Sequence, residues 1–481
     1  MSQSTPTAVA LRKAPTGVPG LDEITNGGFP AGRPTLVCGG PGSGKTLLGI
    51  TFLVNGALLY EEPGVLMSFE ENAEELAQDV AALGFDLSRL VTDRKLVVDY
   101  VHVDRSEIEE TGEYDLEGLF VRLEHAVNSI GARRVLLDTI ESLFGGLENE
   151  GILRAELRRL FRWLRERNLT VVITGERGDT TLTRHGLEEY VTDAVIQLDH
   201  RVVDQISTRR LRVVKYRGSH HGTNEYPFLI DEGGVGVLPV TSLTLGHAAP
   251  SERVSSGLPE LDAMLGGQGF YRGSTVLVSG TAGTGKTTIA AHFVDAACRR
   301  GERCLHFLFE ESPPQMLRNM ASCGLDLGRW VDGGLLQFQA DRPSRHGLET
   351  HLVMMHRAVE RWRPTVVVVD PMTNLLTVGT QIDVRAMLTR MIDFLKLQGI
   401  TALFTSLTSG SADLETTETM ISSLMDSWIL TSLEEAERRR KRWLYVLKAR
   451  GTAHSDEMRE FRIGDHGIDI LPARAREQGG K

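Results

Sequence analysis

Cysteines and long hydrophobic runs are scarce in this sequence, and each shortage excludes a class of protein. Of 481 residues only four are cysteines, and their spacing matches neither a C-x-x-C pair nor a metal-binding cluster. They are Cys38, Cys298, Cys304 and Cys323. We expect reduced, mostly buried thiols in a cytoplasmic protein rather than a disulfide framework. Apolar runs such as residues 366–369 are far shorter than the roughly 20 residues that cross a bilayer, so no membrane span is predicted.

The sequence also has no excess of positive charge and few aromatic residues. It has 53 Lys and Arg against 64 Asp and Glu, a formal net charge of −11, and 6% aromatic residues. Because no segment interleaves basic and aromatic residues, nucleic acid is not an expected partner. Residues 1–14 lack the apolar core of a signal peptide. The composition is that of a soluble globular protein, and the length suggests about two to four domains.

What the sequence does contain is one phosphate-binding motif, present twice. Residues 39–46 read GGPGSGKT and residues 280–287 read GTAGTGKT, and both match G-x-x-x-x-G-K-[ST] after a short apolar run. Glycines allow backbone N–H groups to surround phosphate oxygens, the lysine reaches the terminal phosphates, and the threonine hydroxyl can bind Mg²⁺. The predicted ATP-binding residues of these loops are Gly42, Ser43, Gly44, Lys45 and Thr46, and Gly283, Thr284, Gly285, Lys286 and Thr287.

The similarity between the two halves extends well beyond these loops. Residues 17–22 (GVPGLD) are echoed by residues 257–262 (GLPELD), and later motifs recur in the same order at an offset of about 240 residues. This offset indicates a duplicated domain rather than a solenoid repeat. We predict a disordered N-terminus at 1–14, a first domain at 15–245, a second domain at 246–472 and a short disordered tail at 473–481.

Apolar, β-rich runs alternate with helical stretches in each half. The predicted strands are 35–38, 65–69, 134–138, 170–174, 194–198 and 211–215 in the first half, and 275–279, 304–309, 365–370, 401–405, 428–431 and 443–448 in the second. Residues 156–167 place leucines on one face and arginines on the other, as an amphipathic helix does. The pattern predicts an α/β fold in which a mostly parallel sheet is flanked by helices.

An aspartate ends one predicted strand in each half, where a P-loop protein needs an acidic partner for Mg²⁺. Thr46 and Asp138 would hold the ion in the first half, and Thr287 and Asp370 in the second. An aspartate at a strand end can also mark a turn. The parallel occurrence behind two P-loops favours the Mg²⁺ role.

Paired glutamates follow the second strand of each half, and these are the predicted catalytic residues. They are Glu70 with Glu71, and Glu310 with Glu311. Carboxylates also favour helix N-termini, which is the structural alternative. The carboxyl ends of parallel strands face the ligand crevice, however, so the first glutamate of each pair is predicted to be a general base.

A basic group recurs late in each half, and it gives the remaining predicted ATP contacts. Its members are Lys215, Arg217 and His221, and Lys448, Arg450 and His454. A single copy would be read as a solvated strand end. Phosphoryl transfer gains from a cation placed against the γ-phosphate, often from another subunit. The distance along the chain from the P-loop therefore suggests that ATP lies between adjacent subunits.

Several further segments resemble the KaiC family, the two-domain ATPases and autokinases of the cyanobacterial circadian clock. They include NGGFPAGR at 26–33, RHGLEEYVTD at 184–193, RGSHH at 217–221 and FEES at 309–312. The resemblance covers residues 17–470. It implies two tandem RecA-like P-loop domains, ATP and Mg²⁺ as cofactors, and a homohexameric double ring with ATP at the subunit interfaces.

The resemblance also implies a division of labour between the domains. In that family the first domain mainly hydrolyses ATP, and the second transfers a γ-phosphate to a Ser-Thr pair of the neighbouring subunit. Ser422 and Ser423 fall on the two acceptor positions, and Thr417 on a third position used nearby. Glu70 would then assist water, and Glu310 would take the proton of the acceptor hydroxyl. The alternative is that the serines are only small residues of a polar loop.

The chain departs from the family pattern in two places. Pro371 follows Asp370 where the family has a serine, which would alter the second Mg²⁺ site. Only residues 473–481 stand where the family has a longer tail that recruits KaiA, so a KaiB-like or signalling partner is expected rather than a KaiA-type one. Two other functions stay open: a DNA-dependent RecA-like ATPase of recombination or repair, and a nucleotide-gated signalling scaffold.

Overall fold

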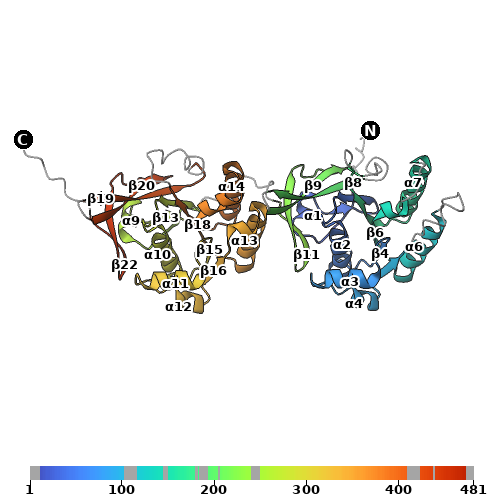
Figure 1. The fold of residues 1–481 in the computed structure, drawn as a ribbon, viewed down its shortest axis with the longest axis horizontal. Coiled ribbons are helices and arrows are strands. Elements are labelled where there is room, and N and C mark those ends of the chain that lie inside the picture. The colour runs from blue at the N-terminus through green and yellow to red at the C-terminus, as the bar shows by residue number, and fades with distance from the viewer. Residues whose placement is uncertain are drawn as a thin grey trace, which may run out of the picture. The chain divides into compact units, whose positions relative to one another are not determined.

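Each half of the chain forms its own α/β unit, and the two units repeat the same order of elements (Figure 1). The computed structural model describes residues 11–101, 116–144, 150–178, 182–183, 193–203, 206–239, 250–408, 423–436 and 439–472. By its internal contacts the chain divides into Met1–Ser242, here called unit 1, and Leu243–Lys481, called unit 2. The predicted fold class, two tandem α/β P-loop domains, is confirmed.

Unit 1 contains eleven described strands and six α-helices. The strands are β1 Lys13–Ala14, β2 Phe29–Pro30, β3 Pro34–Gly39, β4 Gly64–Ser68, β5 Leu96–Tyr100, β6 Arg134–Asp138, β7 Thr170–Glu176, β8 Ala194–Val203, β9 Ile206–Tyr216, β10 Glu225–Asp231 and β11 Gly234–Val237. The helices are α1 Leu21–Ile24, α2 Lys45–Leu59, α3 Ala73–Ala81, α4 Leu87–Thr92, α6 Glu117–Ile130 and α7 Glu150–Glu166, with the 3-10 turn η1 Ile140–Phe144.

Unit 2 repeats these elements. Its strands are β12 Arg253–Val254, β13 Phe270–Tyr271, β14 Thr275–Gly280, β15 Cys304–Leu308, β16 Leu336–Ala340, β17 Val366–Asp370, β18 Thr401–Leu407, β19 Ser427–Ala436, β20 Arg439–Ala449, β21 Arg459–Gly464 and β22 Gly467–Ile470. Its helices are α9 Pro259–Met264, α10 Lys286–Arg299, α11 Pro313–Ala321, α12 Gly328–Asp332, α13 Leu348–Trp362 and α14 Gln381–Leu397, with η2 Pro343–Arg345 and η3 Met372–Thr377.

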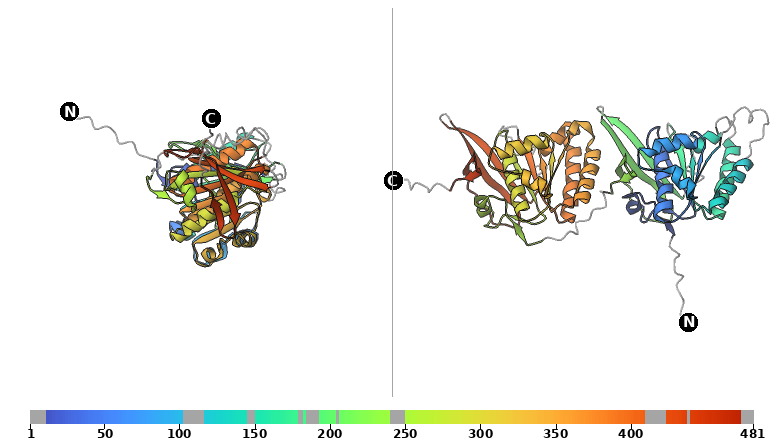
Figure 2. Two further views of the ribbon diagram at one scale, coloured as in Figure 1. Left: turned by 90° about the vertical axis from the view of Figure 1, so that its left-hand side faces the viewer. Right: turned by 90° about the horizontal axis from the view of Figure 1, so that it is seen from below.

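One nine-stranded sheet forms the centre of each unit. The strand order is β5-β4-β6-β7-β3-β8-β9-β10-β11 in unit 1, and β16-β15-β17-β18-β14-β19-β20-β21-β22 in unit 2. The first six strands of each order are parallel, and the last three continue the sheet in antiparallel register. The long β8–β9 and β19–β20 hairpins reach beyond the helices of their own units (right view of Figure 2). The parallel part thus carries an antiparallel extension that the sequence patterns did not predict.

Helices cover both faces of the parallel strands. In unit 1 the alternate residues Val37, Leu66 and Leu136 pack with α2, α3 and α4, while Leu36, Val65 and Val135 pack with α6 and α7. Both sets are buried because the strands lie between two helical layers, which explains their continuous apolar sequences.

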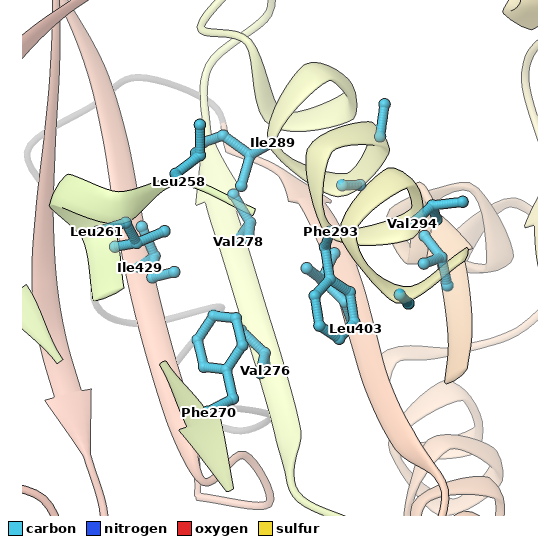
Figure 3. Close-up of a cluster of buried hydrophobic side chains, with 14 of the residues drawn as sticks. Leu258, Leu261, Phe270, Val276, Val278, Ile289, Phe293, Val294, Leu403 and Ile429 are labelled. Carbon is cyan, nitrogen blue, oxygen red and sulfur yellow. The ribbon is translucent and has the colours of Figure 1, made fainter. Parts of the chain in front are cut away.

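The same arrangement recurs in unit 2. Val278 lies beside Ile289 of α10, Phe270 lies beside Val276, and Phe293 of α10 lies against Leu403 (Figure 3). Of the four cysteines, Cys38, Cys298 and Cys304 are buried and none forms a disulfide, as predicted.

The N-terminal boundary needs a correction. Residues 1–14 were predicted to be disordered, but Lys13 pairs with Pro30 and Ala14 with Phe29 in a small antiparallel sheet. Ala14 is buried there. A two-residue strand leaves no periodic pattern to recognise, because its pairing depends on contacts with the rest of unit 1. The predicted tail, residues 473–481, lies outside the described residues.

Candidate nucleotide-binding sites

The P-loop of unit 1 lies at the carboxyl end of β3 and opens helix α2. Lys45, the first residue of α2, places its ammonium group 3.1 Å from the carbonyl oxygen of Gly39 and 3.0 Å from that of Gly40. The lysine is nearly buried, so its charge is held inside the loop. Unit 2 repeats this geometry, with Lys286 Nζ 2.9 Å from the Gly280 oxygen and 2.8 Å from the Thr281 oxygen.

The glycine before each lysine is required by its surroundings. Gly44 and Gly285 have φ of 96° and 92°, and each is the N-cap of its helix without a side-chain cap. A Cβ atom on Gly44 would lie 2.7 Å from Ile230 Cδ1, and one on Gly285 would lie 2.8 Å from Ile463 Cδ1. Glycine therefore leaves the first N–H groups of α2 and α10 accessible, as binding of a phosphate group demands.

The two strand-end aspartates lie beside the P-loop threonines. The Thr46 hydroxyl donates a hydrogen bond of 3.2 Å to Asp138 Oδ1, and Thr174 donates to the same oxygen. Thr287 and Thr405 bond Asp370 in the same way. Burial raises the pKa of both aspartates, and the threonine hydrogen bonds oppose that effect. A cation would strongly favour their ionised form.

These side chains fit Mg²⁺ and a triphosphate. Mg²⁺ in nucleotide sites is usually held by one carboxylate, a hydroxyl, phosphate oxygens and water. Each site supplies the hydroxyl and the carboxylate in mutual contact, together with a lysine and a helix N-terminus for the phosphates. When bound, the ion would neutralise charge on the phosphates. The peptide bond after each aspartate, including Asp370–Pro371, is cis.

The paired glutamates follow β4 and β15 at the same sheet edge. In unit 1, Ser142 Oγ donates a 2.7 Å hydrogen bond to Glu70 Oε1. Burial raises the pKa of Glu71, and the charges of Asp79 and Asp138 add to this effect. In unit 2 the second glutamate, Glu311, accepts hydrogen bonds of 3.3 Å from Asn319 Nδ2.

A cavity lies beside the candidate residues in each unit. The unit 1 cavity measures about 550 Å³, and its walls include the P-loop, Glu71 and Arg209. The unit 2 cavity measures about 330 Å³, and Glu310, Glu311, Asp341 and Arg345 line it. Both volumes are in the range of small-molecule sites.

The predicted basic groups lie far from the P-loop of their own unit. Lys215 pairs with Val195, and Val195 pairs with Leu36 near the start of β3, whereas the P-loop follows Gly39 at the end of β3. In unit 2, Lys448 pairs with Trp428, which pairs with Leu277 near the start of β14. At about 3.3 Å per residue these edges are some 10 Å or more apart. The structure therefore does not bring Lys215 to Lys45, or Lys448 to Lys286, within one unit.

The other members of the basic groups follow the same strands. Arg217 N donates a 2.7 Å hydrogen bond to the Asp193 carbonyl, and Arg450 N donates one of 2.8 Å to the Asp426 carbonyl. His221 stacks with Tyr216 at 6.2 Å between ring centroids, and His454 Nδ1 lies 3.4 Å from the Thr452 carbonyl oxygen. Arg217 and Arg450 therefore occupy equivalent places in the two units, whereas the two histidines have different contacts.

Two arginines that were not predicted from the sequence lie at the P-loops. Arg442 Nε of β20 donates a 3.1 Å hydrogen bond to the Gly283 carbonyl, and Arg209 of β9 lines the unit 1 cavity. They occupy matching positions, since Arg209 and Lys215 are separated by the same spacing as Arg442 and Lys448. This repeated spacing was a usable signal. It was missed because basic residues on an antiparallel strand read as a solvated face.

The two sites also differ in buried titratable groups. Burial raises the pKa of Glu141 in unit 1 to about 7, and its Oε1 accepts a 2.8 Å hydrogen bond from the Glu176 backbone. The corresponding acceptor in unit 2 is the Thr373 hydroxyl, bonded by Leu407 N at 3.3 Å. His306 in unit 2 replaces Leu66 and lies 3.9 Å from Asp370 Oδ2. Burial lowers the pKa of His306 to about 3, so it is neutral.

The predicted acceptor pair straddles the limit of the described residues. Ser422, like Thr417, lies outside them. Ser423 is described and exposed, and its carbonyl oxygen accepts a 2.7 Å hydrogen bond from Arg450 Nη2. Ser423, a predicted acceptor, therefore lies beside Arg450, a predicted γ-phosphate contact, at one edge of unit 2.

Fold and sites together define a protein with two RecA-like P-loop ATPase domains. A family model described as "ATPase: KaiC" matches residues 14–242 and 254–475. The chain belongs to the KaiC family of ATPases.

Named relatives span most of the chain. It is 56% identical over 468 residues to "Circadian clock protein KaiC2" of Synechocystis sp., covering 97% of this chain and 82% of the relative. It is 37% identical to "Circadian clock protein KaiC3" of the same organism, covering 96% and 92% of the two chains. It is 35% identical to "Circadian clock oscillator protein KaiC" of Synechococcus elongatus, covering 96% and 89%. In the part of the chain that the structure describes, no helix combines the length and apolarity needed to cross a membrane.

Proposed function

We propose that this ATPase is also a serine autokinase, in which unit 1 mainly hydrolyses ATP and unit 2 phosphorylates Ser422 and Ser423 of a neighbouring subunit. The observation that carries the proposal is the contact between Arg450 and the Ser423 carbonyl. Arg450 lies too far from the P-loop of its own unit to contact a nucleotide there, yet it contacts the predicted acceptor Ser423. If Lys448 and Arg450 contact the nucleotide of a neighbouring subunit, Ser423 lies close to that nucleotide as well.

The sheet register supports sites shared between subunits. Strand β20 carries Arg442 at the P-loop of its own unit and Lys448 near the opposite edge. A single strand can therefore contact two nucleotides if copies of the chain pack P-loop edge against basic edge. Heterologous packing of this kind forms a ring when the rotation between copies closes, and we propose a homohexamer with two tiers of interfacial ATP.

The side chains support in-line phosphoryl transfer. The acceptor hydroxyl oxygen forms a bond to the γ-phosphorus of Mg·ATP while the bond from this phosphorus to the bridging oxygen of ADP breaks. Glu310 takes the hydroxyl proton, so that phosphoserine and ADP are the products. Lys286, Thr287 and Asp370 hold the nucleotide and ion, and Lys448 and Arg450 of the acceptor subunit offset charge on the γ-phosphate. Unit 1 would transfer the γ-phosphate to water by the same mechanism. The nucleotide and ion would be held by Lys45, Thr46 and Asp138, and Glu70 would assist the attacking water.

Incubation with ATP and Mg²⁺ should place phosphate on Ser422, Ser423 or both. Phosphopeptide mass spectrometry measures this directly. Lys286→Ala should abolish the modification while unit 1 continues to hydrolyse ATP. Hydrolysis without phosphate on either serine would contradict the autokinase and leave a nucleotide-gated scaffold as the better function.

Mixing two variants tests transfer between subunits. Lys286→Ala subunits keep the acceptor serines but lack the second P-loop lysine. Subunits with Ser422→Ala and Ser423→Ala keep the P-loop but lack the acceptors. Neither variant alone should become phosphorylated, whereas mixed assemblies should carry phosphate on the Lys286→Ala chain, which is distinguishable by mass. Absence of phosphate in the mixture, with wild-type subunits active, would place transfer within one chain.

Arg442→Ala should weaken ATP binding at the second site about tenfold, because it removes a charge-assisted hydrogen bond to the P-loop. Titration with a fluorescent ATP analogue in a Lys45→Ala background isolates this site. Arg440→Ala is the matched control, since Arg440 pairs with the exposed Glu435 on the same hairpin. Equal affinities in the two variants would remove Arg442 from the binding site.

A further inference from the structure

The four residues from Ser423 to Asp426 are fixed to the body of unit 2. Arg450 Nη2 donates to the Ser423 carbonyl at 2.7 Å, and the Thr275 hydroxyl donates to the Leu424 carbonyl at 3.4 Å. Met425 is completely buried. The predicted acceptor position is therefore the first residue of an anchored segment that leads into β19.

Asp426 is the centre of this anchor. Its Oδ2 atom lies 2.8 Å from Lys396 Nζ of α14, and it accepts hydrogen bonds from Thr275 N at 2.9 Å and from Thr275 Oγ1 at 3.0 Å. Its Oδ1 atom lies 3.7 Å from Arg450 Nη1. Burial acts to raise the pKa of Asp426, but the bonds from Lys396 and Thr275 outweigh it and hold the pKa below its usual value. The carboxylate thus joins the helix, the sheet and the arginine that contacts Ser423.

Unit 1 holds the matching aspartate in a different way. Asp193 pairs with Arg165 at 2.8 Å and with Arg33 at 3.5 Å. Lys396 takes the place of Arg165 near the end of the preceding helix. Ser274, however, stands where unit 1 has Arg33, and Thr275 stands where it has Pro34, which has no N–H to donate. In unit 2 the second cation on the aspartate is Arg450, the residue that also bonds Ser423.

We infer that Lys396, Asp426 and Arg450 form an acceptor clamp, in which Asp426 orients Arg450 and Arg450 fixes Ser423 for phosphotransfer. The inference rests on the proposed autokinase function and adds positioning residues to it. Phosphoryl transfer needs the acceptor oxygen within about 3–3.5 Å of the phosphorus and in line, and a misplacement of about 1 Å can cost on the order of 100-fold in rate. Asp426 and Lys396 act only through Arg450 and are not catalytic residues.

The clamp predicts an effect confined to the acceptor. Asp426→Asn should lower the rate of phosphate incorporation at Ser423 by about 10- to 100-fold. It should also lower the ratio of phospho-Ser423 to phospho-Ser422, because Ser423 is the bonded residue. Hydrolysis by unit 1 should stay unchanged. Asp193→Asn, which removes the matching carboxylate from unit 1, is the control and should leave both serines normally phosphorylated.

Two milder variants test the clamp even if Asp426→Asn fails to fold. Thr275→Val removes the hydroxyl bonds to Asp426 and Leu424 but keeps the backbone bond, and it should slow Ser423 phosphorylation by about 2- to 10-fold. Lys396→Arg should keep the wild-type ratio of the two phosphoserines, whereas Lys396→Met should lower it. Phosphopeptide mass spectrometry over time, with thermal melting of each variant, gives the required rates.

The outcomes separate the clamp from the function on which it rests. Wild-type chain without phosphoserine overturns both proposals. Phosphorylated wild-type chain with an unchanged rate and ratio in Asp426→Asn and Thr275→Val overturns the clamp alone. Equal loss in Asp426→Asn and Asp193→Asn also overturns it, because the effect would then reflect general stability. Loss in Asp426→Asn with a normal Asp193→Asn supports it.

Discussion

Glu310→Gln is expected to slow phosphorylation of Ser422 and Ser423 by about 100- to 10,000-fold, the range that removal of a general base causes. Glutamine keeps the shape of the side chain but cannot accept the hydroxyl proton. Nucleotide binding should persist, because Lys286, Thr287 and Asp370 are untouched. The initial rate of phosphate transfer from labelled ATP measures the effect, and binding of an ATP analogue confirms that the site is intact.

The neighbouring glutamate supplies the control for this experiment. Glu311 is oriented by Asn319, which donates to its two carboxylate oxygens at 3.3 Å. Glu311→Gln should therefore change the rate only a few-fold. If both variants lost phosphorylation equally, the pair would act as a helix-capping and electrostatic unit. If Glu310→Gln kept the wild-type rate, the general base would have to be another group, and Asp341 in the same cavity would be the first to test.

Unit 1 offers a parallel comparison on water instead of serine. There the corresponding carboxylate, Glu70, is held by Ser142, whereas the matching position in unit 2, Asn374, bonds the Phe309 carbonyl. The two sites thus share the P-loop, the Mg²⁺ aspartate and the glutamate pair but support them differently. These differences are consistent with two reactions on one duplicated fold.

Sequence patterns predicted the parallel strands because burial between two helical layers demands continuous apolar residues. The strand β6 was predicted with its exact limits, Arg134–Asp138. The predicted strands 211–215 and 443–448 lie within the antiparallel strands β9 and β20, but the edge strands β5 and β16 and the outer strands β10, β11, β21 and β22 were not predicted. Polar residues break the apolar pattern of β5 and β10, in which most residues are partly exposed, and glycines break the pattern of the buried strand β11.

The candidate site was predictable where chemistry fixes residue type and spacing, as in the P-loops. Arg209 and Arg442 were not predicted, because the contact of β9 or β20 with a P-loop depends on the tertiary structure. The clamp at Asp426 escaped for the same reason, since Lys396, Thr275 and Arg450 lie on separate elements. The burial of Arg134 was not predicted either. Fully buried arginines are rare, and nothing in the run Arg-Val-Leu-Leu-Asp distinguishes Arg134 from a surface residue.

Arg134 is completely buried, and its side chain connects four parts of unit 1 by hydrogen bonds. Its Nε donates to Glu62 at 2.7 Å, Nη1 to the Phe52 carbonyl at 2.9 Å and Nη2 to the Pro15 carbonyl at 2.8 Å. Its guanidinium also stacks 4.4 Å from the Phe52 ring. These bonds connect β6 to helix α2, to the loop after α2 and to the N-terminal segment.

Arg134→Met should destabilise unit 1 by about 3–5 kcal/mol, because methionine fills the space but leaves two buried carbonyls and a carboxylate without their donor. For a unit of this size the melting temperature should fall by about 6–20 °C. Differential scanning calorimetry, with hydrogen exchange to assign each transition to its unit, measures the change. Hydrolysis should fall as well, since Arg134 begins the strand that ends at Asp138.

A comparison with unit 2 explains why the loss of stability in Arg134→Met is expected only where an arginine makes these hydrogen bonds. Val366 occupies the position of Arg134, and the carboxylate corresponding to Glu62 is Glu302, which pairs with Arg272 at 3.1 Å and Arg300 at 2.8 Å. An apolar residue is tolerated there because other cations satisfy the glutamate. Arg133→Met, which removes the exposed neighbouring arginine, should leave both transitions unchanged. A unit 1 transition that moved no more in Arg134→Met than in Arg133→Met would show that water replaces the lost donors and that the buried arginine adds no net stability.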